Sequence, residues 1–266
     1  MDISVLKNID GNIQELNAKT DDYKKKGSTS LVFSSNTTDW TTQITPPVVL
    51  DNKDNYEVGL IDLETYYSFP NIDTTNNRFI YYAGTLPKVV TIATGTYSIS
   101  DINNAIQTAM RLNGDWNTTA GTYYVTITTN TPTLGSAISI ATGYSVDFRD
   151  KNSLADLLGF DTTQFLTAGT YISPNIVNIL TVNSIFINCN IISGSYSNGS
   201  LSTVLYSYFP SVGPGFKIIQ TPVNVVYLPL LGQHIMSVRI WITDQYGNIM
   251  NFQGETTTCR IQIRRK

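Results

Sequence analysis

The clearest alternation of apolar and polar positions lies near the C-terminal end of the chain, over residues 236–243. Four apolar side chains there share one face: Met236, Val238, Ile240 and Ile242. Because successive side chains of a β-strand point to opposite faces, this spacing predicts a strand with one buried and one solvated face. Residues 256–264 alternate in the same way, and we expect three of their side chains to face inward: Cys259, Ile261 and Ile263.

The segment from Asp244 to Asn248, between these two strands, predicts a reversal of the chain. It contains Gly247 and Asn248, which tolerate positive φ, so we expect a hairpin that joins the two strands. Strands that are wetted on one face are typical of antiparallel sheets, and pairs of such sheets form sandwiches.

Short runs of β-branched and aromatic residues recur from residue 28 onward and predict an all-β domain. The predicted strands are residues 30–34, 56–67, 78–83, 88–93, 123–128, 137–141, 145–148, 176–189, 204–208, 217–219, 225–229, 236–243 and 256–264. Eight strands suffice for a jelly-roll β-sandwich, so the surplus predicts a β-rich insertion at about residues 85–170. The apolar phase changes after Leu60, which predicts a β-bulge beside Gly59 or a strand buried on both faces.

Two short helices are predicted between the strands. In residues 98–114 the apolar side chains recur at helical spacing, with Ser100 or Asp101 as the expected N-cap. Ser153 and Asp156 resemble a shortened capping box, and Gly159 is expected to end that helix. Three Gly-Thr-Tyr fragments, at residues 95–97, 121–123 and 169–171, are interpreted as the starts of strands.

The first 27 residues differ from the rest, because they are rich in charge and their aliphatic side chains hardly repeat. We therefore expect a flexible charged arm at residues 1–27, followed by the jelly-roll domain at residues 28–266. The whole chain is only 14% charged, with a net charge of −3, which argues against a general attraction to nucleic acid or anionic membrane. Lys24, Lys25 and Lys26 are candidates for a weak, local contact with the phosphates of a genome. The simpler interpretation is that these three side chains are only solvated.

The composition also limits the chemistry of the chain. No apolar run approaches the roughly 20 residues of a membrane span, and the N-terminal residues lack the pattern of a signal peptide, so we expect a protein made in the cytoplasm or nucleus. The two cysteines, Cys189 and Cys259, are too few for a disulfide scaffold or a zinc site, and a buried free thiol is the expected state of Cys259.

Candidate catalytic residues are sparse. His234 is the single histidine and lies in a predicted turn, where it has no evident nucleophile to activate, so we interpret it as a surface residue. Asp62 and Glu64 share one strand face, so they are a candidate pair for acid/base catalysis or for binding calcium. The simpler interpretation is that they lie on a solvated strand face or form ion pairs between subunits. We predict no enzyme activity, no cofactor and no metal.

Aromatic side chains gather near predicted strand ends and offer contact surfaces. The chain has 16 tyrosines and 10 phenylalanines, and tyrosine suits large semi-polar interfaces. The candidate interface residues are Tyr66, Tyr67, Phe69, Tyr206, Tyr208 and Phe209, although filling of the core is the default role for at least half of such aromatics.

Several strings, in the same order over about residues 55–266, resemble the penton-type minor capsid proteins of Maverick/Polinton elements, adintoviruses and virophages. They are YEVGLIDLETYYSFPNI, VDFRDKNSLADLLGF, NIISGSY, VLYSYFP, GFKIIQTPVNVVYLPL and IWITDQYGNIMNFQGE. The resemblance implies a single jelly roll that forms a homopentamer at the fivefold vertices of an icosahedral virion, beside a double-jelly-roll major capsid protein. It also implies that the chain termini face the shell interior. A carbohydrate- or receptor-binding β-sandwich is the alternative, and a glycosidase is a third interpretation.

Overall fold

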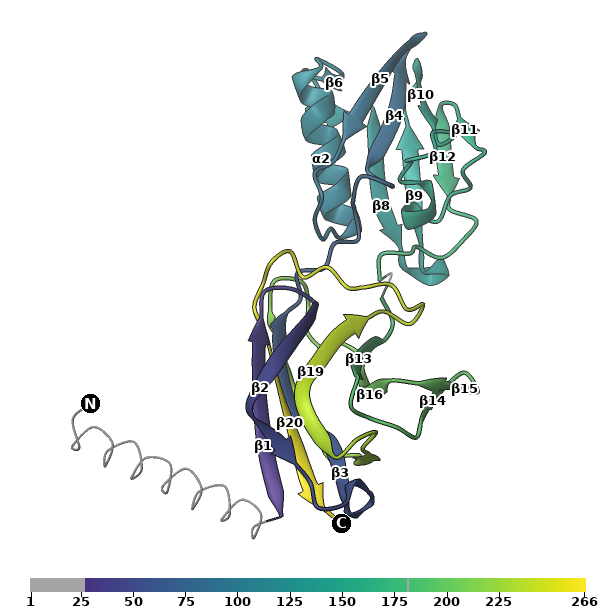
Figure 1. Ribbon diagram of the computed structural model, residues 1–266. Coiled ribbons are helices and arrows are strands. Elements are labelled where there is room, and N and C mark those ends of the chain that lie inside the picture. The colour runs from purple at the N-terminus through teal and green to yellow at the C-terminus, as the bar shows by residue number, and fades with distance from the viewer. Residues whose placement is uncertain (1–26, 181) are drawn as a thin grey trace, which may run out of the picture. The chain divides into compact units, whose positions relative to one another are not determined.

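The structure, a computed structural model, describes residues 27–180 and 182–266 (Figure 1). The expected charged arm therefore lies outside the described residues except for Gly27, and so do Lys24, Lys25 and Lys26. The chain divides into two compact units. The first unit combines the residues up to Tyr67 with Asn183–Lys266, and the second unit is Ser68–Val182.

Two antiparallel sheets form the first unit (Figure 1). One sheet has the order β1 (Ser28–Ser35), β20 (Thr257–Arg265), β3 (Tyr56–Tyr66) and β17 (Lys217–Gln220), and β18 (Leu228–Pro229) also pairs with β3. The other sheet has the order β16 (Val204–Tyr208), β13 (Ile185–Cys189), β19 (His234–Thr243) and β2 (Asp39–Val49). The hairpin β14 (Ser195–Ser197) with β15 (Ser200–Ser202) and the 3-10 turn η1 (Lys53–Asn55) complete this unit.

Strand pairing in the first unit is nested. Among the described residues, β1 pairs with β20, β2 with β19, β3 with β17 and β13 with β16, so that the first strand meets the last and the pairing proceeds inward. A chain that folds back on itself in this way and wraps into two facing sheets is a jelly roll. The second unit interrupts the jelly roll between β3 and β13.

The core of the jelly roll lies between the two sheets. Its fully buried side chains come from both sheets and alternate along their strands: Val58, Leu60, Leu63, Ile185, Ile187, Val238, Ile240, Ile242, Cys259, Ile261 and Ile263. The inward face expected for the last strand is therefore confirmed.

Two expectations for the C-terminal region are wrong. Met236 is 63% exposed, and Ile235 is buried in its place, because the register of β19 against β2 shifts between Ile235 and Ser237. The expected reversal at Asp244–Asn248 does form, since Asp244 N–H donates to the Asn248 carbonyl at 2.9 Å and Thr243 pairs antiparallel with Ile249. It does not join β19 to β20 as expected, because these two strands belong to different sheets. The turn that begins at Asp244 instead starts a crossing from one sheet to the other.

The phase change in β3 is a β-bulge. Arg260 pairs with Asp62 and Ile261 pairs with Leu60, so Ile61 is the extra residue, and the bulge lies two residues beyond Gly59. The bulge lets Leu60 and Leu63 both face the core.

Gly59 permits a close approach of the segment that precedes β18. A Cβ atom at this position would lie 2.5 Å from Val225 Cγ1 and 3.0 Å from the Val226 carbonyl oxygen. Beside it, the Tyr227 hydroxyl donates to Gln262 Oε1 at 2.6 Å, and the Arg264 guanidinium lies 3.4 Å from the centroid of the Tyr227 ring. This segment therefore covers part of the outer face of the β3 sheet.

Replacing Gly59 with alanine is expected to lower the free energy of unfolding by about 1–3 kcal/mol, because the added methyl group overpacks this contact. Gly232→Ala is the control, since its Cβ would meet nothing within 4 Å. Urea denaturation of both variants measures the difference. Equal stability of the two variants would show that the Val225–Tyr227 segment moves away freely.

Strand β2 is absent from the predicted strands. Its side chains are mostly exposed, and Pro46 and Pro47 lie within it, so it shows no apolar alternation. Proline is tolerated there because β2 is an edge strand.

The second unit packs two helices and several short sheets around its own core (Figure 1). One sheet has the order β11 (Phe165–Leu166), β10 (Tyr144–Asp147), β4 (Arg78–Ala83) and β5 (Leu86–Thr91), and another has the order β12 (Gly169–Ile172), β9 (Gly135–Ile140) and β8 (Val125–Asn130). The remaining elements are α2 (Ile99–Leu112), α3 (Ala155–Leu158), η2 (Thr131–Thr133) and the pair β6 (Trp116–Asn117) with β7 (Thr122–Tyr123). The unit extends beyond the expected insertion at both ends, because β4 pairs with β10 on the N-terminal side and Val177 and Ile179 pack against the core on the C-terminal side.

Both predicted helices form, with caps that differ from the expected ones. Ser98, rather than Ser100 or Asp101, is the N-cap of α2, and Asp101 completes a capping box with it. The N-cap of α3 is Leu154, with no side-chain capping bond, and Gly159 ends this helix at a φ of 79°.

A buried carboxylate links three strands of the second unit. Asp115 accepts hydrogen bonds from the Tyr81 hydroxyl at 2.7 Å and the Tyr144 hydroxyl at 3.3 Å, and its Oδ2 lies 2.7 Å from Lys88 Nζ. Burial alone raises the pKa of Asp115, but the hydrogen bonds from Lys88 and Tyr81 outweigh it, and the pKa lies below its ordinary value of 3.8.

Stability of the second unit is therefore expected to fall in acid. A depressed pKa in the folded state means that Asp115 stabilises the fold above about pH 4 and that this contribution is lost as the pH falls through the folded-state pKa. In Asp115→Asn the free energy of unfolding should fall less steeply below about pH 4 than in the wild type. Asp156→Asn, on the exposed side of α3, should leave that slope unchanged. Urea unfolding across this pH range measures both, and equal slopes for wild type and Asp115→Asn would contradict the prediction.

Candidate assembly surfaces

Asp62 and Glu64, the two carboxylates that share one strand face, each form an ion pair with a basic side chain. On the outer face of the β3 sheet, Asp62 lies 3.3 Å from Arg260 and Glu64 lies 2.5 Å from Lys217, and a third cross-strand pair joins Glu57 to Arg264. These pairs form a row along a solvated sheet face. The geometry thus joins each acid to a base on the neighbouring strand and does not present the two acids to one substrate.

The other candidates for chemistry lie apart from one another. His234 is the first residue of β19, opposite Val49, and its side chain is exposed. Cys189 and Cys259 are buried free thiols, as expected for Cys259, and burial raises the pKa of Cys189 to about 12. Among residues 27–180 and 182–266, no three His, Cys, Asp or Glu side chains gather as metal ligands. In the same part of the chain, no helix is long and apolar enough to span a membrane.

Burial divides the six aromatic residues expected at an interface. Tyr67, Phe69 and Tyr208 are at most 7% exposed, so their side chains belong to the interior of the chain. Burial also raises the pKa of Tyr67 and Tyr208. Tyr66 and Phe209 are exposed, and Tyr206 is half-buried. The sequence offered no signal that separates these two groups, because all six lie in similar aromatic strand ends.

One side of the jelly roll ends in the edge strands β16 and β17. Gln220 Nε2 donates to the Tyr206 hydroxyl at 3.0 Å and so joins these edges of the two sheets. Four large side chains are exposed on or beside these strands: Tyr66, Phe209, Phe216 and Ile219. We call these four residues the β17 flank. Phe216 and Ile219 were not among the candidates, although they lie in the string GFKIIQ.

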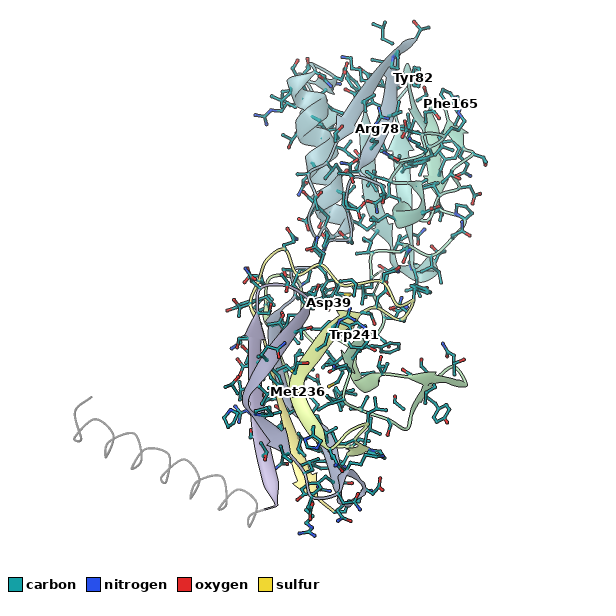
Figure 2. All side chains as sticks on the ribbon, viewed as in Figure 1. Asp39, Arg78, Tyr82, Phe165, Met236 and Trp241 are labelled. Carbon is teal, nitrogen blue, oxygen red and sulfur yellow. The ribbon has the colours of Figure 1, made fainter. Side chains whose placement is uncertain are left out.

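The opposite side of the jelly roll ends in β1 and β2. On β19, the strand next to β2, Arg239 forms a bidentate pair with Asp39 of β2, at 2.8 and 2.6 Å, and its guanidinium lies 4.7 Å from the centroid of the Trp241 ring. Met236 is exposed on the same strand as Arg239 and Trp241 (Figure 2). We call Asp39, Met236, Arg239 and Trp241 the β2 surface.

The β2 surface is held in place before any partner binds. The hydrogen bonds from Arg239 lower the pKa of Asp39, so the pair stays ionised near neutral pH. Arg, Trp and Met are enriched at protein interfaces, and a guanidinium fixed by a carboxylate and an aromatic ring loses little rotamer freedom on binding. The two sides of the jelly roll therefore carry different surfaces that are both suited to protein contact.

Comparison with known proteins agrees with this fold. The sequence matches no protein-family model and no curated protein. The crystal structure of selenomethionine-labelled mavirus penton protein is similar, with a TM-score of 0.51 and 10% sequence identity, over 90% of this chain and 99% of that chain. This likeness and the nested strand pairing confirm the expected all-β jelly-roll fold with few helices.

Proposed function

We propose that this chain is a penton-type minor capsid protein, of which five copies form a ring at each vertex of an icosahedral capsid. The observation that carries the proposal is a single jelly roll interrupted by a second unit, in a chain whose fold matches that of mavirus penton protein over nearly the full length of both. The motifs shared with penton-type proteins of Maverick/Polinton elements and virophages support it independently.

The two sides of the jelly roll suit a ring. A closed ring requires a heterologous contact, in which one surface of a subunit meets a different surface of its neighbour. The β17 flank is apolar and the β2 surface combines Met236 and Trp241 with a fixed arginine, so each supplies side chains that favour burial. Stable interfaces bury about 1,200–2,000 Å² in total. The charges of the β2 surface, Asp39 and Arg239, would enter such an interface already paired with each other, which limits the cost of their desolvation.

A vertex protein also needs neighbours other than itself. The proposal places a double-jelly-roll major capsid protein around the ring and the chain in the virion, with Lys24, Lys25 and Lys26 able to contact the genome weakly. Under this proposal the chain catalyses no reaction, because non-covalent contacts between subunits account for its role.

The test is cryo-electron microscopy of particles formed when this chain is co-expressed with the matching major capsid protein. Density for five copies of the jelly roll at the vertices is expected. Density at hexavalent positions, or absence of the chain from assembled particles, would exclude the vertex role. Size measurement of the isolated chain is less decisive, because a ring can depend on the surrounding shell.

A further inference from the structure

A shallow depression of about 290 Å³ opens on the second unit, and its lining includes residues of the sheet β12-β9-β8. Two of the Gly-Thr-Tyr fragments contribute to it, since Tyr123 ends the first fragment and Gly169 with Thr170 begins the other. Segments that are far apart in the sequence therefore line one hollow that the capsid role does not use.

Three hydroxyl groups form a row along one side of the depression. Thr126, Ser139 and Thr170 are opposite one another on β8, β9 and β12, so their side chains share one face of the sheet. The hydroxyls of Ser139 and Thr170 lie 3.2 Å apart, and both side chains are exposed. Each hydroxyl can donate one hydrogen bond and accept two, so the row keeps free capacity for a polar ligand.

Tyr124 also lines the depression, and its partly buried ring packs against the core of the second unit. The Tyr124 ring stacks on Tyr144, with centroids 4.4 Å apart and an interplanar angle of 14°, and the Tyr144 hydroxyl is bonded to Asp115. These contacts fix the ring in place. The lining continues with Ala141 and Gly169, whose small size leaves room next to Tyr124.

The chemistry of the lining selects a class of ligand. All residues that line the depression are uncharged, so nothing there compensates a phosphate or a carboxylate. An aromatic ring beside a row of hydroxyls fits a ligand that has an apolar C–H face and several hydroxyl groups. The volume lies at the lower end of small-molecule sites, which suits one or two rings.

We infer that this depression is a binding site for a neutral saccharide, with the sugar C–H face against Tyr124 and its hydroxyl groups bonded to Thr126, Ser139 and Thr170. The site lies on the second unit, whereas the β17 flank and the β2 surface both lie on the first unit. Saccharide binding therefore does not depend on the vertex role.

Saturation-transfer NMR on the full chain tests this inference, with glucose, galactose, mannose and N-acetylglucosamine as probes and N-acetylneuraminic acid as the anionic comparison. Thr170→Val removes one hydroxyl at nearly constant shape and should weaken binding about three- to tenfold. Ala141→Phe fills the depression and should abolish the signal. Thr128→Val is the matched control, because Thr128 is exposed on the same strand as Thr126 and does not line the depression.

The expected result is a signal from at least one neutral sugar that survives in Thr128→Val, weakens in Thr170→Val and disappears in Ala141→Phe. No signal from any neutral sugar would overturn the inference, and so would a signal that Ala141→Phe leaves intact. Stronger binding of N-acetylneuraminic acid than of every neutral sugar would overturn the assignment of ligand class. Incorporation of the same variants into capsids is measured in parallel, so a failure of the vertex role is seen separately.

Discussion

Ile261→Ala is expected to lower the free energy of unfolding by about 2–5 kcal/mol, which is among the largest losses that a single truncation gives. Ile261 is completely buried on β20, between Leu60 of β3 and Leu31 of β1. Because β20 has a neighbour on each side, the surrounding strands cannot collapse easily into the cavity that the substitution leaves. Urea denaturation measures the loss.

Arg260→Ala, one residue away, is the matched control. The Arg260 side chain is 49% exposed and lies 3.3 Å from Asp62, and exposed ion pairs contribute about 1 kcal/mol or less. A larger loss from Arg260→Ala than from Ile261→Ala would show that the inward and outward faces of β20 are exchanged.

Ile219→Asp is expected to remove the chain from capsid vertices while leaving the chain folded. Ile219 is 63% exposed on β17 and lies opposite Glu64, so the new carboxylate destabilises the isolated chain by about 1 kcal/mol or less. In the proposed ring the same position is buried, where an uncompensated charge costs about 3–5 kcal/mol and weakens association by at least about a hundredfold. The measurement is the amount of this chain in purified particles relative to major capsid protein.

Two control variants test whether the loss of incorporation is specific to a charge on the β17 flank. Ile219→Val keeps an apolar side chain and should retain incorporation. Leu86→Asp makes a comparable change on β5, an exposed edge strand of the second unit, and should also retain it. Normal incorporation of Ile219→Asp, or equal loss in Leu86→Asp, would exclude the β17 flank as a ring interface.

Much of the first unit follows from local patterns. The buried faces of β20 and of most of β19 follow from strict alternation, because side chains on a pleated strand must point to opposite sides. The bulge in β3 was visible as a phase change, since an extra residue moves all later side chains to the other face. Gly159 marks the end of α3, because glycine accepts the left-handed conformation there.

Other features carried no local signal. Strand β2 is held by its pairing with β19 rather than by burial of its own side chains, so its mostly exposed residues did not alternate. Alternation places Tyr66 and Tyr67 on opposite faces, but their residue type does not show which of the two is buried. Among the assembly surfaces, Tyr66 and Phe209 were candidates from the sequence, whereas Phe216, Ile219 and the Asp39–Arg239–Trp241 group were found only in the structure.

The sequence by itself determined the all-β class, the inward face of β20 and the presence of two short helices. These properties depend on the period of side-chain direction and on the conformational preferences of single residues, which act over a few neighbouring positions. Only the tertiary structure decided which strands pair. The turn that begins at Asp244 is compatible with a hairpin between β19 and β20, yet the two strands lie in different sheets, where β19 pairs with β13 and β2 and β20 pairs with β1 and β3. The two candidate assembly surfaces and the depression proposed to bind a saccharide join residues from distant segments, so these residues come together only once this pairing is made.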